Sequence, residues 1–131
     1  AADAGHAEAQ CALGQAYLMG EGVPQDAGRA AALLGRAAEQ GDPRAQCNLG
    51  AMYAQGLGVQ LDYDEARRLY EASAAQGHPD GQYNLAVVFA QGLGSCRRNL
   101  ARARELCEAA AAQGQGQAAE LLRSLAAGEG A

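Results

Sequence analysis

The sequence predicts an all-α fold, a solenoid of about three helix-turn-helix repeats followed by a C-terminal capping helix. Three observations predict it. Gly5, Gly41 and Gly77 begin three similar segments 36 residues apart, and a fourth segment begins at Gly114. Each segment holds two stretches with apolar residues at helical spacing, and glycines and polar capping residues separate those stretches. A fixed period of roughly 20–50 residues indicates supersecondary units stacked side by side.

The second copy shows the first helix of a repeat most clearly. Pro43 suits the first turn of a helix, where its missing N–H does no harm, and Asp42 suits the N-cap before it. The helix is predicted to run to about Gln55, and Gly56 and Gly58 end it because glycine readily takes the positive φ of a C-terminal cap and turn. The positions expected to pack recur at helical spacing: Ala45, Leu49, Gly50, Met52 and Tyr53.

The second helix of each copy begins at a polar N-cap of its own. Asp62, followed three residues later by Glu65, predicts a capping box. Asp26 and Asn99 hold the equivalent position in the first and third copies. The helix in the second copy is expected to turn four residues inward: Ala66, Leu69, Tyr70 and Ala74.

These elements divide the chain into a single array. The opening Ala1–Gly5 matches Ala37–Gly41, so we interpret residues 1–4 as the end of a preceding unit and expect the sequence to be cut from a longer protein. After Gly114 only one helix fits, about Gln117 to Ala126, which is a C-terminal cap or a truncated fourth unit. The predicted division of residues 1–131 is 5–40, 41–76 and 77–113 for the three repeats and 114–131 for the capping helix and tail.

The third copy departs from the other two. Gly81 stands where the second copy has Ala45, Ala86 where it has Gly50, and Phe89 replaces a tyrosine. Its turn, Ser95-Cys96-Arg97-Arg98, carries one extra residue.

Composition excludes several classes of function. The net charge of −5 opposes general affinity for nucleic acids or anionic membranes, so we expect neither as a partner. All ten cationic residues are arginine, and without lysine there is no Walker A lysine, Schiff-base lysine or Ser-x-x-Lys centre. No apolar stretch approaches the roughly 20 residues needed to span a bilayer, so membrane insertion is not expected.

The repeated motif resembles SEL-one-like repeats (SLR), which are relatives of the tetratricopeptide repeat. The pattern is Ala-Gln-x-x-Leu-Gly-x-x-Tyr-x-x-Gly-x-Gly-Val, then Asp-x-x-x-Ala, then Ala-Ala-x-Gln-Gly. In the first copy it comprises Ala9-Gln10, Leu13-Gly14, Tyr17, Gly20, Gly22-Val23, Asp26, Ala30, Ala37-Ala38 and Gln40-Gly41, and it recurs from Ala45-Gln46 to Gln76-Gly77. The resemblance implies a right-handed α/α superhelix whose first helices line a concave face that holds proteins or peptides.

A groove can be sketched by placing the first helices on a helical wheel. Residues off the Leu-Gly-Tyr packing face should project into it, and these include Cys11 and Cys47. Asn48 and Asn84 share one position, where each either bonds a neighbouring helix or faces the groove to grip a ligand's backbone. The predicted peptide-binding set is Gln15, Leu18, Met19, Arg44, Asn48, Ala51, Gln55, Asp80, Tyr83, Asn84, Val87 and Gln91.

No catalytic, metal-binding or cofactor-binding residue is predicted. The Gly-x-Gly turns follow helices, whereas dinucleotide loops follow strands, so they are interpreted as turns. The four cysteines form no Cys-x-x-Cys pair, and free thiols lean weakly toward a reducing compartment such as the cytoplasm. Cys107 aligns with Leu34 and Tyr70 and is expected in the core, while His6 and His78 are expected to cap first helices.

One basic cluster stands out in this acidic chain. Arg97, Arg98, Arg102 and Arg104 surround the altered turn of the third copy, where cations at a helix N-terminus oppose the helix dipole. The cluster is either a binding patch for an acidic partner or a solvated turn.

The sequence therefore predicts a non-enzymatic, all-helical scaffold or adaptor that binds a protein or peptide through the concave face of its first helices. One alternative is a structural array that links other domains or associates end to end with itself. A hydrolase related to cysteine-rich SLR proteins is less favoured, because no nucleophile–base pair stands out and lysine is missing.

Overall fold

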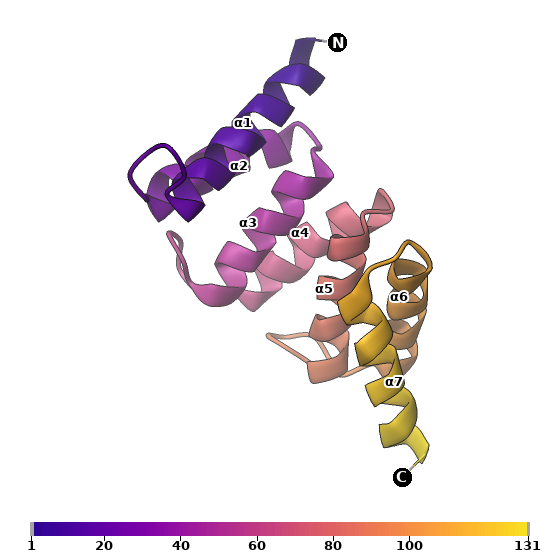
Figure 1. The fold of residues 1–131 in the computed structure, drawn as a ribbon. Helices are drawn as coiled ribbons and strands as arrows, with labels where there is room; N and C mark the ends of the chain where they lie inside the picture. Colours follow the sequence, from indigo (N-terminus) through magenta and orange to yellow (C-terminus); the bar gives the residue numbers. More distant parts are fainter. Residues whose placement is uncertain (1, 131) are drawn as a thin grey trace.

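The computed structural model describes the backbone of residues 2–130 and the side chains of residues 6–127. Over that range the chain forms seven α-helices and no strand (Figure 1). The first helices of the repeats, and the final helix, are α1 (Ala2–Met19), α3 (Pro43–Gln55), α5 (Pro79–Gln91) and α7 (Gly116–Gly130). The second helices are α2 (Ala27–Glu39), α4 (Tyr63–Ala75) and α6 (Leu100–Ala112).

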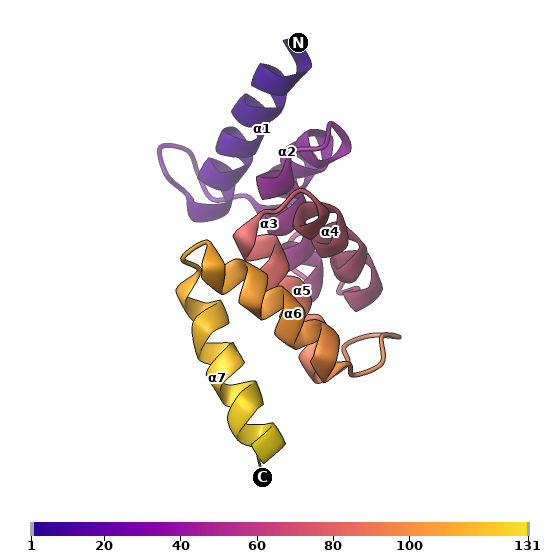
Figure 2. The same cartoon turned by 90° about the vertical axis from the view of Figure 1, so that its right-hand side faces the viewer.

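The helices pack mainly on their neighbours in the sequence. Each repeat is a hairpin, α1 with α2, α3 with α4 and α5 with α6, and each second helix also packs on the first helix that follows it. Helix α3 in addition touches α5, so these two first helices are neighbours. Figure 2 shows the result, an array with α1 at one end and α7 at the other. The predicted all-α solenoid of three repeats and a final helix is confirmed.

The predicted N-caps of the second helices are confirmed. Asp26, Asp62 and Asn99 each accept a hydrogen bond from the backbone N–H three residues later, all at 3.1 Å. The capping box is only half formed. The Glu65 carboxylate contacts Arg68, and the N–H of Asp62 donates instead to the carbonyl of Tyr53 (3.0 Å). That backbone bond closes the inter-helix turn and leaves the carboxylate without its expected partner.

The caps of the first helices differ from one repeat to the next. Asp42 accepts from the N–H groups of Arg44 and Ala45 at 2.9 and 3.2 Å, as predicted. His78 occupies the N-cap of α5 but makes no capping bond with its side chain. Gln115 takes over this role for α7, accepting from the N–H of Ala118 at 2.7 Å.

The two ends of the chain differ from expectation. Helix α1 continues through Gly5, whereas the turns at Gly41 and Gly77 have positive φ. Two of the four residues 2–5 are alanine, which has the highest helix propensity of all residues. Helix α7 runs from Gly116 to Gly130, beyond the predicted span of Gln117 to Ala126.

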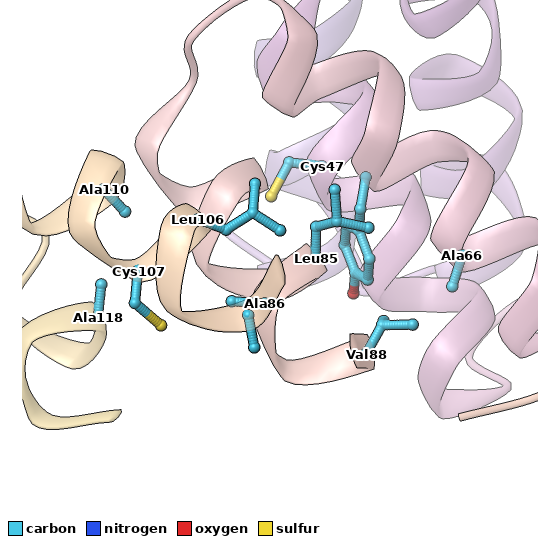
Figure 3. Packing of buried hydrophobic residues seen from close by; sticks show 11 residues of the cluster. Cys47, Ala66, Leu85, Ala86, Val88, Leu106, Cys107, Ala110 and Ala118 are labelled. Carbon is cyan, nitrogen blue, oxygen red and sulfur yellow. The ribbon is translucent and has the colours of Figure 1, made fainter. Parts of the chain in front are cut away.

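The core consists of two clusters of buried residues along the array and contains many alanines. One cluster of buried residues joins the second and third repeats to α7 and includes Tyr70, Leu85 and Cys107 (Figure 3). A second cluster joins the first repeat to the second through Leu34 and Met52. Cys107 is buried, as predicted, but Tyr53 is only half-buried.

Paired glutamines connect the two helices of each repeat. Gln40 donates to Gln10, Gln76 to Gln46 and Gln113 to Gln82, with N–O distances of 2.7, 2.9 and 2.9 Å. These are the Gln of Ala-Gln and the Gln before the closing glycine in the repeated motif. Each pair satisfies two side chains that bridge the open end of a hairpin, which explains why both positions recur in every copy.

The second glycine of the inter-helix turn permits contact with the preceding repeat in the second and third copies. A Cβ at Gly58 would lie 2.5 Å from the carbonyl oxygen of Ala27, and one at Gly94 would lie 2.9 Å from the Cβ of Tyr63. The turn of one repeat therefore rests on the start of the second helix of the repeat before it. Glycine is required there both for its positive φ and for the missing side chain.

Candidate functional site

The predicted groove residues all lie at the surface of the first helices. None of the twelve is buried: Gln15, Met19, Arg44, Gln55, Asp80 and Gln91 are exposed, and Leu18, Asn48, Ala51, Tyr83, Asn84 and Val87 are partly exposed. Met19 is the most notable, because 67% of this large apolar residue is exposed. These positions are available to a partner, and whether a partner uses them remains a prediction.

Four of these predicted residues line one hollow together with Glu21. Gln15, Leu18 and Met19 of α1 meet Asn48 of α3 across a hollow of about 320 Å³. Glu21, from the turn after α1, is the fifth lining residue. Sequence reasoning missed Glu21 because it interpreted the Gly20-Glu21-Gly22 segment only as a turn. The hollow combines two apolar side chains, two amides and one carboxylate.

The two equivalent asparagines behave differently. The side-chain N–H of Asn84 donates to the sulfur of Cys47 at 3.2 Å, so Asn84 connects α5 to α3. Asn48 lines the hollow beside Gln15 and has no hydrogen bond in the described part of the chain. The sequence left both roles open for both residues: Asn84 bonds a neighbouring helix, and binding of a ligand by Asn48 remains a prediction.

The amides of the first helices fall into two groups. Those that are engaged comprise Gln10, Gln46 and Gln82 in the glutamine pairs and Asn84 on Cys47. Within the described residues, the side-chain amides of four others form no hydrogen bond with the chain: Gln15, Asn48, Gln55 and Gln91. A free amide at the surface can donate and accept at once, which is the pattern that a peptide backbone requires.

Two residues that the helical wheel placed in the groove are buried instead. Cys11 and Cys47 are 1% and 4% exposed. Burial raises the pKa of both thiols, that of Cys47 to about 11, and the hydrogen bond from Asn84 offsets only part of this effect. The helical wheel assumed that a first helix packs through one face only. In the array α3 packs on α5 as well as on the second helices α2 and α4, so more of its surface is buried. Neither thiol can contribute to a groove.

The arginine cluster is partly engaged within the chain. Arg98 donates to the carbonyl of Ala90 at 3.1 Å, which ties the altered turn to the end of α5. Arg102 lies 3.7 Å from the carboxylate of Glu105, an exposed pair that contributes little to stability. Arg97 is exposed and Arg104 half-buried. Binding of an acidic partner by these four residues remains a prediction.

The described residues offer no metal centre, since no group of three or more His, Cys, Asp or Glu lies close enough to hold an ion. Within the same residues, no helix combines the length and apolar character needed to cross a membrane. The four cysteines are unpaired, and Cys96 is the one that is not buried.

Comparison with protein families matches the Sel1 repeat three times, at residues 7–42, 43–78 and 79–115. These three units correspond to the repeats found in the sequence, with starts displaced by two residues. Comparison with curated proteins gives no match.

Two solved structures are closely similar to this chain. One is a protective antigen present in uropathogenic Escherichia coli strains and displaying an SLR fold (TM-score 0.82, 38% identity). The other is a Sel1 repeat protein from Oxalobacter formigenes (TM-score 0.83, 31% identity). The matches cover 87% and 88% of this chain but only 24% and 46% of those proteins, so both relatives contain substantially more chain.

Proposed function

The chain belongs to the Sel1 repeat family, whose members generally act as scaffolds for protein interactions, and from this we propose that it is a non-catalytic scaffold that holds a peptide segment on the exposed face of its first helices. The observation that carries the proposal is the set of unengaged amides on that face. Gln15, Asn48, Gln55 and Gln91 are spread over three first helices and have no partner within the described chain.

The chemistry of this face favours an extended peptide over a small polar metabolite. Surface amides placed along successive helices can bond the N–H and C=O groups of a ligand backbone. The hollow beside Met19 adds an apolar contact for one ligand side chain, and Glu21 at its rim favours a neighbouring cation. Ala51 and Val87 lie on the same face and have short side chains, so they leave room for a ligand backbone between the amides.

The test replaces those two short residues with glutamate. The double variant Ala51→Glu, Val87→Glu should fold normally, because both positions are partly exposed, yet lose the bound partners that the natural chain recovers from a lysate. A matched control is Ala109→Glu, an exposed alanine on α6 among the second helices. Cross-linking followed by mass spectrometry would identify each partner and the residues that it touches.

Distinct results separate the alternatives. If partners survive the double variant but are lost from Ala109→Glu, binding takes place on the second helices and the proposal is wrong. If neither variant changes partner recovery while the chain still joins or orders other domains, the protein is a structural array. Substrate turnover abolished by a single polar substitution would instead show an enzyme.

A further inference from the structure

A further hollow lies between the first and second repeats, where α2 and α4 both pack on α3 (Figure 2). Its volume is about 380 Å³, and none of its lining residues belongs to the twelve predicted groove residues. We call it the junction hollow. Its apolar lining includes Leu49, Tyr53 and Leu69, and its charged residues are Glu39, Glu65 and Arg68.

One wall of the junction hollow consists of small residues. On α2 they include Ala31 and Gly35, and a Cβ placed on Gly35 would meet no atom of another helix within 4 Å. The equivalent residues of α4 are Arg67 and Glu71, whose guanidinium and carboxylate groups are 3.4 Å apart. Both Ala31 and Gly35 therefore leave open the space that a bonded pair of long side chains has on α4.

The equivalent hollow between the second and third repeats is smaller, at about 300 Å³, and Glu71 lines it. That hollow exists with a complete repeat packed before it, and none of the residues that line it comes from the first repeat. Hollows at these junctions are therefore open in the middle of the array, and the opening of the junction hollow does not depend on where the array begins.

The position of Glu65 is held by an arginine in the other two repeats. In the first repeat it is Arg29, whose guanidinium carbon lies 5.8 Å from the centre of the Tyr17 ring. A guanidinium at that distance is attracted to the electron-rich face of a tyrosine ring. In the third repeat it is Arg102, which lines its hollow together with Glu71.

The second repeat keeps the ring and reverses the charge beside it. Tyr53 is half-buried, and no guanidinium lies over its ring within the described residues. Arg68 is bound to Glu65 by two hydrogen bonds, which balances the charge of both. Glu39 is exposed, and its carboxylate forms no ion pair or hydrogen bond with the described part of the chain. Two glutamates and one arginine thus leave the lining with one net negative charge.

We propose that the junction hollow binds an arginine side chain of a partner protein. The guanidinium takes the place over Tyr53 that Arg29 takes over Tyr17, and the carboxylate of Glu39 pairs with it. The methylene groups of the bound arginine pack on the leucines of the lining. Arginine fits better than lysine, because its planar guanidinium can stack on a ring and bond a carboxylate at two points. This site is separate from the groove face and does not depend on it.

The test uses the tripeptide acetyl-Ala-Arg-Ala-amide, titrated into the intact chain and followed by NMR chemical shifts. Saturable shifts in the millimolar range are expected at Gly35, Tyr53 and Leu69. The same tripeptide with citrulline in place of arginine should bind several-fold more weakly, because citrulline keeps the planar shape but carries no charge. Added salt should weaken the binding of the arginine tripeptide only.

Variants of the hollow test its ring and its charge. Glu65→Arg restores the arginine of the other repeats and should weaken binding by at least about tenfold, because the chain then supplies its own guanidinium and repels the ligand. Glu39→Gln should weaken binding several-fold. Glu120→Gln, the same change at an exposed glutamate of α7, is the control and should leave binding unchanged.

A double variant tests the size of the hollow. Ala31→Arg, Gly35→Glu places the bonded pair of α4 on α2 and should prevent saturable binding. It should fold normally, since both positions are partly exposed and the loss of a glycine favours helix. Thermal unfolding of each variant checks that loss of binding is not loss of structure.

Four results would overturn the proposal. They are equal binding of the arginine and citrulline tripeptides, no saturable shift at the solubility limit, unchanged binding by folded Glu65→Arg, and unchanged binding by the folded double variant. Saturable binding of agmatine without binding of the tripeptide would also overturn it, since the hollow would then be a site for small amines. Ala51→Glu, Val87→Glu should leave the tripeptide shifts unchanged, so this site and the groove are tested independently.

Discussion

The second and third repeats have the same fold but fill the space between their helices with different pairs of residues. In the second repeat a Cβ at Gly50 would lie 2.8 Å from the ring of Tyr70, so the large ring occupies the space that a side chain at Gly50 would need. In the third repeat the equivalent residues are Ala86 and Cys107, both fully buried. A smaller residue on the second helix is matched by a larger one on the first.

The junctions between repeats show the same compensation. Between the first and second repeats, Ala37 and Ala45 are both fully buried. Between the second and third, the equivalent residues are Ser73 and Gly81, and a Cβ at Gly81 would lie 2.7 Å from the Cβ of Ser73. Each departure of the third copy is therefore matched by a change in the residue that it packs against. The comparison teaches that the combined volume of the two packed residues must stay nearly constant, whereas either residue alone can vary.

The strongest test of this comparison moves the pair of the third repeat into the second. Tyr70→Cys should lower the free energy of unfolding by about 2–5 kcal/mol, because it leaves a cavity beside Gly50. Gly50→Ala alone should also destabilise, by about 1–3 kcal/mol, through overlap with the ring. On the Tyr70→Cys background the same glycine substitution should instead stabilise by about 1 kcal/mol, since it fills space and favours helix. Urea denaturation of all four proteins measures the coupling, and additive effects would contradict paired packing.

A smaller effect is expected at the junction of the second and third repeats. Gly81→Ala should cost about 1–3 kcal/mol, because its Cβ would overlap the hydroxyl oxygen of Ser73 and would also meet the Cβ of Ser73 and, at 3.1 Å, the backbone nitrogen of Ala74. Adding Ser73→Ala recreates the pair of the first junction and should recover part of the loss, because it removes the hydroxyl oxygen, although it also removes the 2.8 Å hydrogen bond from Ser73 to the carbonyl of Pro43.

Gly35→Ala is the control for this junction. It makes the same chemical change in α2 at a point where no atom lies within 4 Å of the new Cβ, and it should stabilise by about 0.5–1 kcal/mol. The melting temperatures of the two variants measure the difference. Equal melting shifts for Gly81→Ala and Gly35→Ala would show that the junction is not tightly packed.

The smallest effect concerns the altered turn of the third repeat. The N–H and hydroxyl of Ser95 both donate to the Asp64 carboxylate, at 2.9 and 2.7 Å, and hold the pKa of Asp64 below its ordinary value of 3.8. The first repeat has Gly28 in place of Asp64, so the turn of the second repeat has no such carboxylate to bind.

Because the folded pKa is the lower one, this contact stabilises the protein above the unfolded pKa, and the contribution is lost as pH falls through the folded pKa. Ser95→Ala should raise the pKa of Asp64 toward 3.8 in an NMR titration, and its slight destabilisation should disappear in strong acid. Ser124→Ala, an exposed serine of α7, is the control. An unchanged Asp64 titration in Ser95→Ala would show that the turn is not bound to α4.

The parts of the fold that local sequence determines could be predicted from it. The period, the bounds of α3 and the caps at Asp26, Asp42, Asp62 and Asn99 depend on residues within a few positions of one another. The pairing of Ser73 with Gly81 could not be predicted, because it depends on how closely two helices approach. Whether each asparagine forms a hydrogen bond within the chain could not be predicted either, because Asn84 donates to Cys47, which lies 37 positions away in the sequence.

The candidate site was predicted only in outline. Comparison of equivalent positions on successive first helices predicted twelve surface residues, and none of the twelve is buried. The wheel was wrong for Cys11 and Cys47 because it allots one packing face to a helix that has neighbours on several sides.

Packing between helices that are adjacent in the sequence also governs how this molecule gains and loses its structure. Almost every contact forms between segments that the ribosome makes one after another, so the relative contact order is low and folding is expected in microseconds to milliseconds. A hairpin formed anywhere can serve as a nucleus, and its neighbours then add to it in either direction. Under heat or mechanical load, loss of one hairpin should destabilise mainly the hairpins next to it, because each packs chiefly on its immediate neighbours.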